Sequence, residues 1–280
     1  MEEECFSKAS QRVLSMKGES PTITIATVTY NAQATLQRTI DSVAAQTYRH
    51  IEHMIVDGCS SDGTFLLVQR YVERNTHAVV PHQIKVVREP DHGLYDAMNK
   101  ALANATGDYI VFLNAGDCLH AETTIADLVE KVDWLKGDAH NPAIVYGETD
   151  LVDEKGRFLR HRRLQAPAQL DWRSFADGML VCHQSFYVRT DLARVQEYDV
   201  RYRFSADYDW CIRLLKRASR RRLPVLNANM ILTDYLSEGM TTRNHRASLM
   251  ERFCLMAMHY GLTTAVVRHV WFVVRAVLKR

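Results

Sequence analysis

The most informative stretch of the chain is Gly107-Asp108-Tyr109-Ile110-Val111-Phe112-Leu113-Asn114-Ala115-Gly116-Asp117. Its apolar part, residues 109–113, is typical of a strand that is buried on both faces of a sheet. The strand is followed by a turn of small residues that carries the amide of Asn114 and the carboxylate of Asp117. Such oxygen ligands suit a divalent cation whose shell is completed by phosphate oxygens and water. The stretch therefore predicts a turn that handles a diphosphate at the mouth of a sheet.

Outward from this strand, strands and helices alternate from residue 22 to about residue 150. Strand-like apolar runs occupy residues 23–30, 53–56, 84–88, 109–113 and 144–146. The segments between them carry apolar residues at helical spacing, such as Leu36, Ile40 and Val43. Repeated strand–helix units predict an α/β fold with a doubly wound, mainly parallel sheet and helices on both faces.

Polar turns follow four of the predicted strands. In open α/β sheets, ligands bind beyond the carboxyl ends of the strands. The four polar strand ends are Thr29-Tyr30-Asn31, Asp57-Gly58, Glu89-Pro90-Asp91 and Asn114-Ala115-Gly116-Asp117. Together at one edge of the sheet, they predict a binding site of the size of a nucleotide.

Composition sets outer limits on the function. The chain has 280 residues, 47% of them hydrophobic, which allows one large domain or one domain with an appendage. A formal net charge of +2 argues against a dedicated nucleic-acid binder. Six scattered cysteines, an acidic start and no apolar signal core predict a protein of the reducing cytosol. The longest apolar segment, residues 266–278, is interrupted by three basic residues and is not expected to span a membrane.

The C-terminal third is cationic, and two interpretations of it remain open. Residues 213–222 hold six basic side chains and no acidic one, which suits either a membrane or lipid phosphate or merely a solvated helix face. Near the end, Val267, Val270, Trp271, Val274 and Leu278 share one helical face, with Arg268, Arg275 and Lys279 on another. This amphipathic helix either lies on the inner membrane surface or packs its apolar stripe on the domain.

Several polar residues allow both a structural and a functional interpretation. Asp57 ends a predicted strand, where a carboxylate can bind a base or ribose, whereas Asp62 is best explained as a helix cap. Asp207 and Asp209 open a predicted helix, so that one can cap the helix while the other acts as a general base. His183 alone is more typical of a hydrogen-bonded structural residue.

The segment Tyr95-Asp96-Ala97-Met98-Asn99-Lys100 begins another predicted helix. Asp96 there is explained by a first-turn charge. Helix N-termini also bind phosphates, and Asn99 or Lys100 would assist in that role.

Taken in order, these motifs resemble family 2 glycosyltransferases of the GT-A fold. The resemblance runs from about residue 21 to about residue 240 and is closest to the branch that builds bacterial surface polysaccharides, including the colanic-acid type of enzyme. It rests on Thr29-Tyr30-Asn31, residues 56–64 and 89–100, the turn ending in Asp117, His183-Gln184 and Ala206-Asp207-Tyr208-Asp209.

The resemblance implies a division of the chain. Residues 1–20 are expected to form an arm and residues 21–240 the GT-A domain, with a nucleotide-sugar-binding half (21–120) and an acceptor half (121–240). Residues 241–280 are expected to form basic amphipathic helices.

The resemblance also implies an activity. It is the inverting transfer of a hexosyl or N-acetylhexosaminyl group from a nucleotide-sugar donor, expected to be UDP-linked, to a glycan or a polyprenyl-diphosphate-linked acceptor. Mn²⁺ or Mg²⁺ is the expected cofactor. The protein would work in the cytoplasm or on the inner face of the cytoplasmic membrane.

The family motifs assign roles to particular residues. Asp207 is expected to be the base and Asp117 the metal ligand, with His183 positioning the acceptor. The expected substrate-binding set is Thr29, Tyr30, Asn31, Asp57, Asp91, Asp96, Asn99, Lys100, Asn114, His183 and Asp209. Two departures stand out: Asn114 replaces the first acid of the usual Asp-x-Asp metal motif, with altered spacing, and Ala206 replaces the Glu before the base.

Two other functions remain open. A sugar nucleotidyltransferase on a similar sheet would need a glycine-rich, basic phosphate loop near the first strand, and residues 29–35 offer none. A non-catalytic scaffold that binds nucleotide sugar is favoured by the altered metal motif but disfavoured by the presence of Asp117 and Asp207.

Overall fold

The computed structural model describes residues 20–132, 134, 141–237 and 245–278. The expected N-terminal arm lies outside these residues except for Ser20. Of the C-terminal stripe, Lys279 and the side chains of Arg275 and Leu278 also lie outside them.

The first half of the chain alternates strand and helix. Its elements are β1 (Ile23–Thr29), α2 (Leu36–Ala44), β2 (Ile51–Asp57), α3 (Thr64–Asn75), β3 (Gln83–Arg88), α4 (Leu94–Asn104) and β4 (Tyr109–Phe112). β1, β2 and β4 are buried along their whole length, as expected for strands with a helix on each face.

The second half is less regular. Its elements are β5 (Cys118–Leu119), α5 (Thr124–Val132), β6 (Ile144–Val152), β7 (Phe158–His161), η1 (Ser174–Asp177), η2 (His183–Ser185), β8 (Phe186–Arg189), α6 (Thr190–Ala193), α7 (Ala206–Arg220) and β9 (Val225–Leu236). β6 is longer than the predicted strand 144–146 and pairs with β9 along its continuation. This continuation was not predicted because it contains polar residues and lacks an apolar pattern.

All nine strands of the described residues belong to one sheet. The order along it is β3-β2-β1-β4-β8-β6-β9-β5, with β7 beside β6. The pairs β2–β3, β1–β2, β1–β4 and β6–β9 are parallel, whereas β8 is antiparallel to both β4 and β6. The sheet is therefore mixed, with a parallel N-terminal half and an antiparallel strand inserted from the second half.

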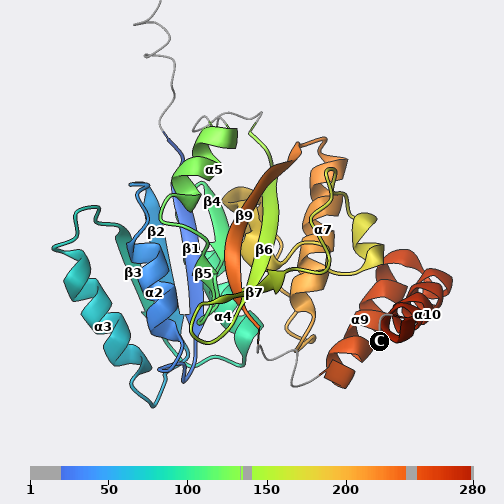
Figure 1. Cartoon of the computed structure of the whole chain (residues 1–280), viewed down its shortest axis with the longest axis horizontal. Helices are drawn as coiled ribbons and strands as arrows, with labels where there is room; N and C mark the ends of the chain where they lie inside the picture. The colour runs from blue at the N-terminus through green and yellow to red at the C-terminus, as the bar shows by residue number, and fades with distance from the viewer. Residues whose placement is uncertain (1–19, 133, 135–140, 238–244, 279–280) are drawn as a thin grey trace, which may run out of the picture.

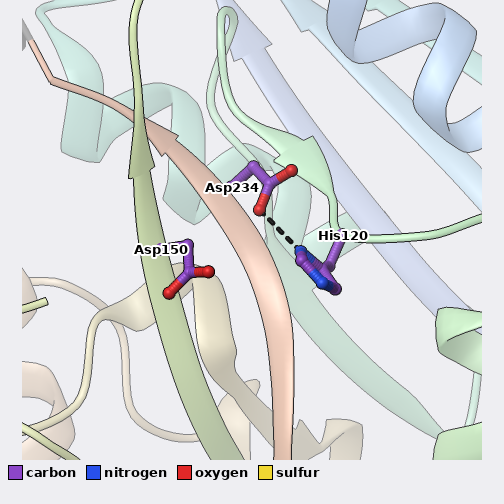
Figure 2. Close-up of side chains that lie close together, drawn as sticks. All are labelled: His120, Asp150 and Asp234. Carbon is purple, nitrogen blue, oxygen red and sulfur yellow. Dashed lines mark hydrogen bonds and ion pairs between the residues drawn. The ribbon is translucent and has the colours of Figure 1, made fainter. Parts of the chain in front are cut away.

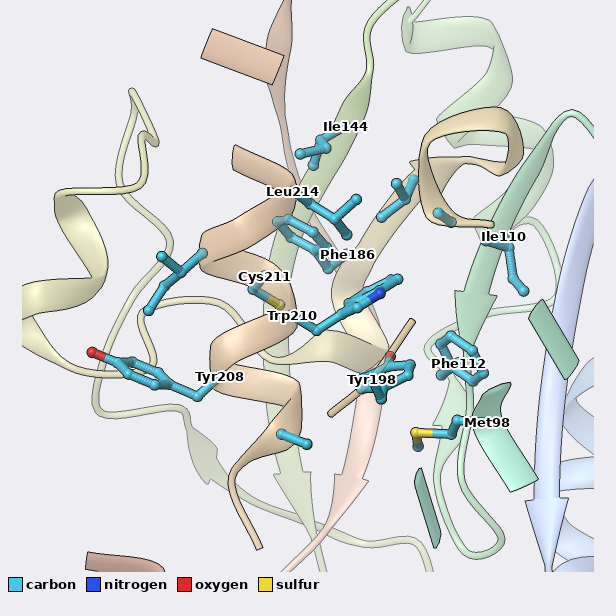
Figure 3. Packing of buried hydrophobic residues seen from close by; sticks show 14 of the residues in the cluster. Met98, Ile110, Phe112, Ile144, Phe186, Tyr198, Tyr208, Trp210, Cys211 and Leu214 are labelled. Carbon is cyan, nitrogen blue, oxygen red and sulfur yellow. The ribbon is translucent and has the colours of Figure 1, made fainter. Parts of the chain in front are cut away.

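Helices cover both faces of this sheet (Figure 1). On one face, α4 and α7 pack on β1, β4, β6 and β8 through a large aromatic core in which Tyr198 and Trp210 stack with ring centroids 4.7 Å apart (Figure 3). On the other face, α2, α3 and α5 pack through two smaller clusters. The predicted α/β fold with helices on both faces is thus confirmed.

Two helices follow the sheet, α9 (His245–Tyr260) and α10 (Leu262–Leu278), and they form a pair beside α7 (Figure 1). This confirms the expected C-terminal helical extension. None of the helices in the described part of the chain is both long and apolar enough to cross a bilayer.

Candidate active site

The carboxyl ends of three parallel strands lie level with one another. Thr29 of β1 pairs with Asp57 of β2, which in turn pairs with Arg88 of β3. The loops that follow these strands therefore meet at one edge, as the sequence predicts.

Asp57 anchors the loop that follows it. Its fully buried carboxylate accepts hydrogen bonds from the Ser60 hydroxyl (2.5 Å) and the Ser60 backbone amide (3.1 Å), and lies 3.3 Å from Nε of Arg88. Ser60 in turn accepts a hydrogen bond from the backbone amide of Asn31. The side-chain oxygen of Asn31 accepts one from the amide of Ser61, so the first two loops are locked together.

Tyr30, Gly58 and Asp91 converge from three different loops. A β-carbon built on Gly58 would lie 2.1 Å from Oδ2 of Asp91 and 3.3 Å from Cδ2 of Tyr30. Only a glycine leaves room for this approach. Tyr30 remains 63% exposed, and the Thr29 hydroxyl, although buried, has no hydrogen-bond partner among the described residues. The structure thus brings together an exposed ring, a carboxylate and a free hydroxyl.

The three candidate residues of α4 have partners within the protein. The Asp96 carboxylate accepts a hydrogen bond from the backbone amide of His92, and Lys100 donates to the carbonyl of Pro90 (2.5 Å). Both polar atoms of the Asn99 side chain bond to the backbone of Tyr198. These contacts shape the 89–93 loop and join α4 to the second half of the chain. They give the three residues structural roles, and substrate binding by them stays a prediction.

A second group of polar residues surrounds Asp207 at the start of α7. His183 Nδ1 lies 3.1 Å from Oδ2 of Asp207, and His183 Nε2 lies 3.2 Å from Nδ2 of Asn114. Because the Asn114 amide nitrogen can only donate, Nε2 accepts and Nδ1 carries the proton that is donated to Asp207. Asn114 Oδ1 is buried without a hydrogen-bond partner among the described residues, which leaves one free acceptor beside this chain of contacts.

Tyr95 completes the surroundings of Asp207. Its hydroxyl donates to Oδ1 of Asp207 (3.1 Å), which also accepts the backbone amide of Tyr208 (2.9 Å). Burial alone would raise the pKa of Asp207, but the hydrogen bond from His183 and the nearby positive charge of Arg252 outweigh it, so the pKa is lowered. Asp207 is therefore ionised at neutral pH and able to accept a proton.

Helix α9 supports this group from the side. The Glu251 carboxylate accepts hydrogen bonds from the backbone amides of Arg203 (2.9 Å) and Phe204 (2.8 Å). The hydroxyl of Ser205 donates to the carbonyl of Ser248. The loop that leads into Asp207 is thus held by the C-terminal helices, which makes them part of the site's frame.

Asp117 closes the turn after β4 but is well enclosed by protein donors. Gln184 Nε2 donates to its Oδ2 and the backbone amide of Leu236 donates to its Oδ1, both at 2.9 Å. Burial is the main reason that the pKa of Asp117 is raised to about 6. The turn is secured by Thr39, whose hydroxyl donates to the Asp117 carbonyl and accepts the amide of Gly116.

These residues meet the first requirement for a divalent cation at the turn. The free Oδ1 of Asn114 and the buried carboxylate of Asp117 are oxygen ligands of the kind such an ion prefers. A cation would also offset the cost of ionising Asp117 in its buried position.

A separate cluster of possible ligands lies on β6, on β9 and directly after β5. The ligand atoms of His120, Asp150 and Asp234 lie within 4.8 Å of one another (Figure 2). Each carboxylate already pairs with an imidazole: Asp234 with His120 and Asp150 with His161, both at 2.8 Å. The sequence gives little warning of this cluster, since its members are far apart along the chain.

Asp209 points away from Asp207. Its carboxylate pairs with Nε2 of His259 (2.7 Å) and Nε of Arg213 (2.5 Å). The structure therefore separates the two aspartates that the sequence places together, and only Asp207 joins His183 and Asn114. Tyr95 and Gln184 were not predicted as site residues, although both lie within motifs that carry the family resemblance.

Comparisons with known proteins show the family to which the chain belongs. Residues 24–196 match the sequence pattern of the family described as glycosyl transferase family 2. A PGL/p-HBAD biosynthesis glycosyltransferase of Mycobacterium bovis (strain BCG / Pasteur 1173P2) is 32% identical over 196 residues, which cover 69% of this chain and 70% of the relative. A teichuronic acid biosynthesis glycosyltransferase of Bacillus subtilis, TuaG, is 37% identical over 103 residues, covering 36% of this chain and 38% of the relative.

Solved structures show the same fold. S. aureus TarS 1-349 in complex with UDP superposes with a TM-score of 0.61 at 15% identity, over 84% of this chain and 65% of that one. The mannosyltransferase PcManGT from Pyrobaculum calidifontis, in complex with GDP-Man and Mn²⁺, superposes with a TM-score of 0.58 at 17% identity, over 94% of this chain and 80% of that one. The architecture is that of GT-A glycosyltransferases, and by sequence the chain belongs to glycosyl transferase family 2.

Proposed function

We propose that this glycosyltransferase moves a sugar from a nucleotide-diphosphate donor, UDP-linked, to a hydroxyl of a glycan or lipid-linked acceptor, with inversion at the anomeric carbon. The observation that carries the proposal is Asp207, a carboxylate kept ionised by His183 and Arg252 beside the edge where the strand ends meet. The names of the relatives, which refer to PGL/p-HBAD and teichuronic acid biosynthesis, support a role in the biosynthesis of a bacterial surface polysaccharide.

The nucleoside is proposed to lie against Tyr30, Gly58 and Asp91. The exposed ring offers a stacking surface, and Asp91 offers a carboxylate to the ribose or base. Asp57 contributes mainly by holding the loop after β2, since its carboxylate already bonds Ser60. The hydroxyl of Thr29, at the end of β1, is buried and has no hydrogen-bond partner among the described residues.

In the reaction, Asp207 would take the proton of the acceptor hydroxyl as the oxygen attacks the anomeric carbon from the side opposite the diphosphate. Hydrogen bonds from Tyr95 and His183 fix the carboxylate, so that no reorientation is needed at the moment of transfer. Asn114 and Asp117 would hold a Mn²⁺ or Mg²⁺ ion, which supplies positive charge to the departing diphosphate.

The first test is a thermal-shift screen of nucleotide sugars with and without Mn²⁺ or Mg²⁺, since a bound donor stabilises the folded state in proportion to its affinity. Nucleotide release is then assayed with the donor that binds, in the presence and absence of acceptors. Release that depends on acceptor identifies a transferase, release without acceptor a hydrolase, and binding without release the scaffold.

The variant Asp207→Asn tests the base directly. It is expected to bind the donor as tightly as the wild type and to lose transfer, because the amide cannot accept the proton. Asp209→Asn is a control of the same chemistry two residues further along, where the carboxylate faces Arg213 and His259. Turnover by Asp207→Asn at the wild-type rate would contradict the assignment.

A further inference from the structure

A basic cavity lies on the side of α7 that faces away from Asp207. It has a volume of about 440 Å³ and is lined by Gln196 and by the six residues that we call the basic pocket, Arg213, Lys216, Arg217, Arg220, Arg221 and His259. Cavities that bind small ligands have volumes from roughly 300 to 1,000 Å³. Since a helix rises about 1.5 Å per residue, the pocket begins roughly 9 Å along α7 from Asp207 and is separate from the proposed reaction centre.

Arg213 and Asp209 form a neutral ion pair at one side of the pocket. Lys216 Nζ lies 2.9 Å from Nδ1 of His259, and His259 Nε2 lies 2.7 Å from Asp209. Because a lysine ammonium can only donate, Nδ1 of His259 accepts and Nε2 carries the proton given to Asp209. His259 is therefore uncharged in this arrangement, and the Asp209 carboxylate is the counter-ion of Arg213.

The other cations have little compensation. Among the described residues, Lys216, Arg217, Arg220 and Arg221 form no ion pair within 4.0 Å, although Asp191 lies close enough to Arg221 to be affected by its charge. Nε of Arg217 is buried and has no hydrogen-bond partner among these residues. Burial and the charge of Arg220 lower the pKa of Lys216, as expected where cations crowd together.

The ordinary explanation for basic residues here is the dipole of α7. Arg217 and Arg220 stand in its last turn, where cations are stabilised by the partial negative charge at a helix C-terminus. That partial charge is about half of an elementary charge. It is too small to balance Lys216 and three arginines around one cavity, and an external anion would offset their repulsion.

We propose that the basic pocket binds a phosphate or diphosphate group. Arginine guanidinium groups suit phosphate because they present parallel N–H donors to two of its oxygens, and the pocket offers several of them with a lysine. The ligand is either a soluble phosphate compound or the headgroup of an anionic lipid, and the two share this chemistry. The inference does not depend on the proposed transfer reaction.

The test compares two double variants of equal charge change. Arg217→Gln/Arg220→Gln removes two cations from the pocket. Arg49→Gln/Arg70→Gln removes two exposed cations elsewhere on the surface. Metal-free wild type and both variants are titrated with inorganic pyrophosphate by calorimetry, and in parallel are sedimented with vesicles of phosphatidylglycerol or phosphatidylcholine.

The pocket variant is expected to bind at least about tenfold more weakly, which corresponds to about 1.4 kcal/mol, while the control matches the wild type. Weakening only with pyrophosphate identifies a soluble phosphate ligand, and weakening only with phosphatidylglycerol identifies a lipid headgroup. Equal affinities for all three proteins with both probes would overturn the proposal. If the double variant fails to fold, the single variant Arg221→Gln, at an exposed position, replaces it. Its binding is also expected to be weaker than that of the wild type, by a smaller but measurable factor.

Discussion

The imidazole of His183 lies between two residues of the proposed site, donating from Nδ1 to Asp207 (3.1 Å) and accepting at Nε2 from Asn114 (3.2 Å). The turn after β4 is thus linked to the first turn of α7 through a single side chain. Because the donated hydrogen bond favours the ionised carboxylate, His183 controls the pH at which Asp207 can act.

Replacement of His183 by alanine is expected to move the acidic limb of the pH–rate profile to higher pH. The pKa of Asp207 is lowered by its hydrogen bond with His183, so loss of that bond raises it. A hydrogen bond to a charged group contributes roughly 1.5–3 kcal/mol, which corresponds to about one to two pH units. His120→Ala, which breaks a similar pair with Asp234, should leave the profile in place. An unshifted limb in His183→Ala would show that another group sets the protonation of the base.

Tyr95→Phe is expected to reduce turnover by about tenfold without unfolding the protein. It removes only the hydroxyl that donates to Asp207, and a single hydrogen bond of this kind accounts for about 1–2 kcal/mol. Tyr198→Phe is a matched control: its ring stacks on Tyr95 with centroids 5.4 Å apart, but its buried hydroxyl has no partner among the described residues. Steady-state rates of the two variants should therefore differ, and equal rates would remove Tyr95 from the site.

The contrast between Tyr95 and Asp57 shows what the sequence could and could not predict. Asp57, Asp91 and Asp117 were found because each follows an apolar strand, and the parallel sheet then brings strand ends together. Tyr95 was placed only at the start of a predicted helix and was given no role in the site, because its partner Asp207 is 112 residues away and no local pattern predicts such a contact. Asn99 shows the opposite case, because the sequence predicted that it binds phosphate near the start of a helix. In the structure its side chain forms hydrogen bonds with the backbone of Tyr198.

Gly116→Ala is expected to destabilise the protein more than Gly93→Ala does. Both glycines have a positive φ, +108° and +122°, which costs an alanine roughly 1–3 kcal/mol. A β-carbon on Gly116 would also lie 2.9 Å from Cδ2 of Leu236, whereas one on Gly93 meets nothing within 4 Å. Chemical denaturation of both variants measures the difference. Equal losses of unfolding free energy in the two variants would mean that the Leu236 side chain can move aside without a measurable free-energy cost.

The metal-free wild type is expected to lose stability relative to Asp117→Asn as the pH rises from 4 to 8. The pKa of Asp117 rises from 3.8 to about 6 on folding, so the folded state favours its protonated form. Its contribution to stability is full below about pH 4 and is lost as the pH rises through 6, by roughly 3 kcal/mol at 1.36 kcal/mol per pH unit.

Chemical denaturation of wild type and Asp117→Asn between pH 4 and pH 8 should therefore show a difference in unfolding free energy that changes steadily in favour of the variant as the pH rises. Asp153→Asn should instead differ from the wild type by an amount that stays constant over this range, because hydrogen bonds from Arg157 lower the pKa of Asp153 below its ordinary value and its carboxylate titrates only at more acidic pH. A gap that does not depend on pH would contradict the raised pKa of Asp117. If Asp117 holds the metal, stabilisation of the wild type by Mn²⁺ should also be lost in Asp117→Asn and kept in Asp234→Asn.

The exposed face of α10 leads to a prediction about location. Arg268 pairs with Asp177, and Phe272 approaches Gly178, so this side of the helix faces the domain. Val267, Val270 and Trp271 are between 51% and 60% exposed, so the apolar stripe points away from the domain instead of packing on it. We propose that the stripe rests on an anionic membrane surface, where amphipathic helices bury their apolar side chains.

Val267→Glu/Val270→Glu is expected to reduce sedimentation with anionic vesicles severalfold, because carboxylates would then have to enter the lipid interface. Val79→Glu is the control, since Val79 is 95% exposed on a loop far from this stripe in the sequence. Sedimentation velocity of the soluble proteins separates the membrane from a second copy of the chain. A membrane contact requires the vesicle-bound fraction of the double variant to fall. If the double variant still sediments with vesicles but changes from dimer to monomer, the stripe mediates self-association and the membrane proposal is wrong.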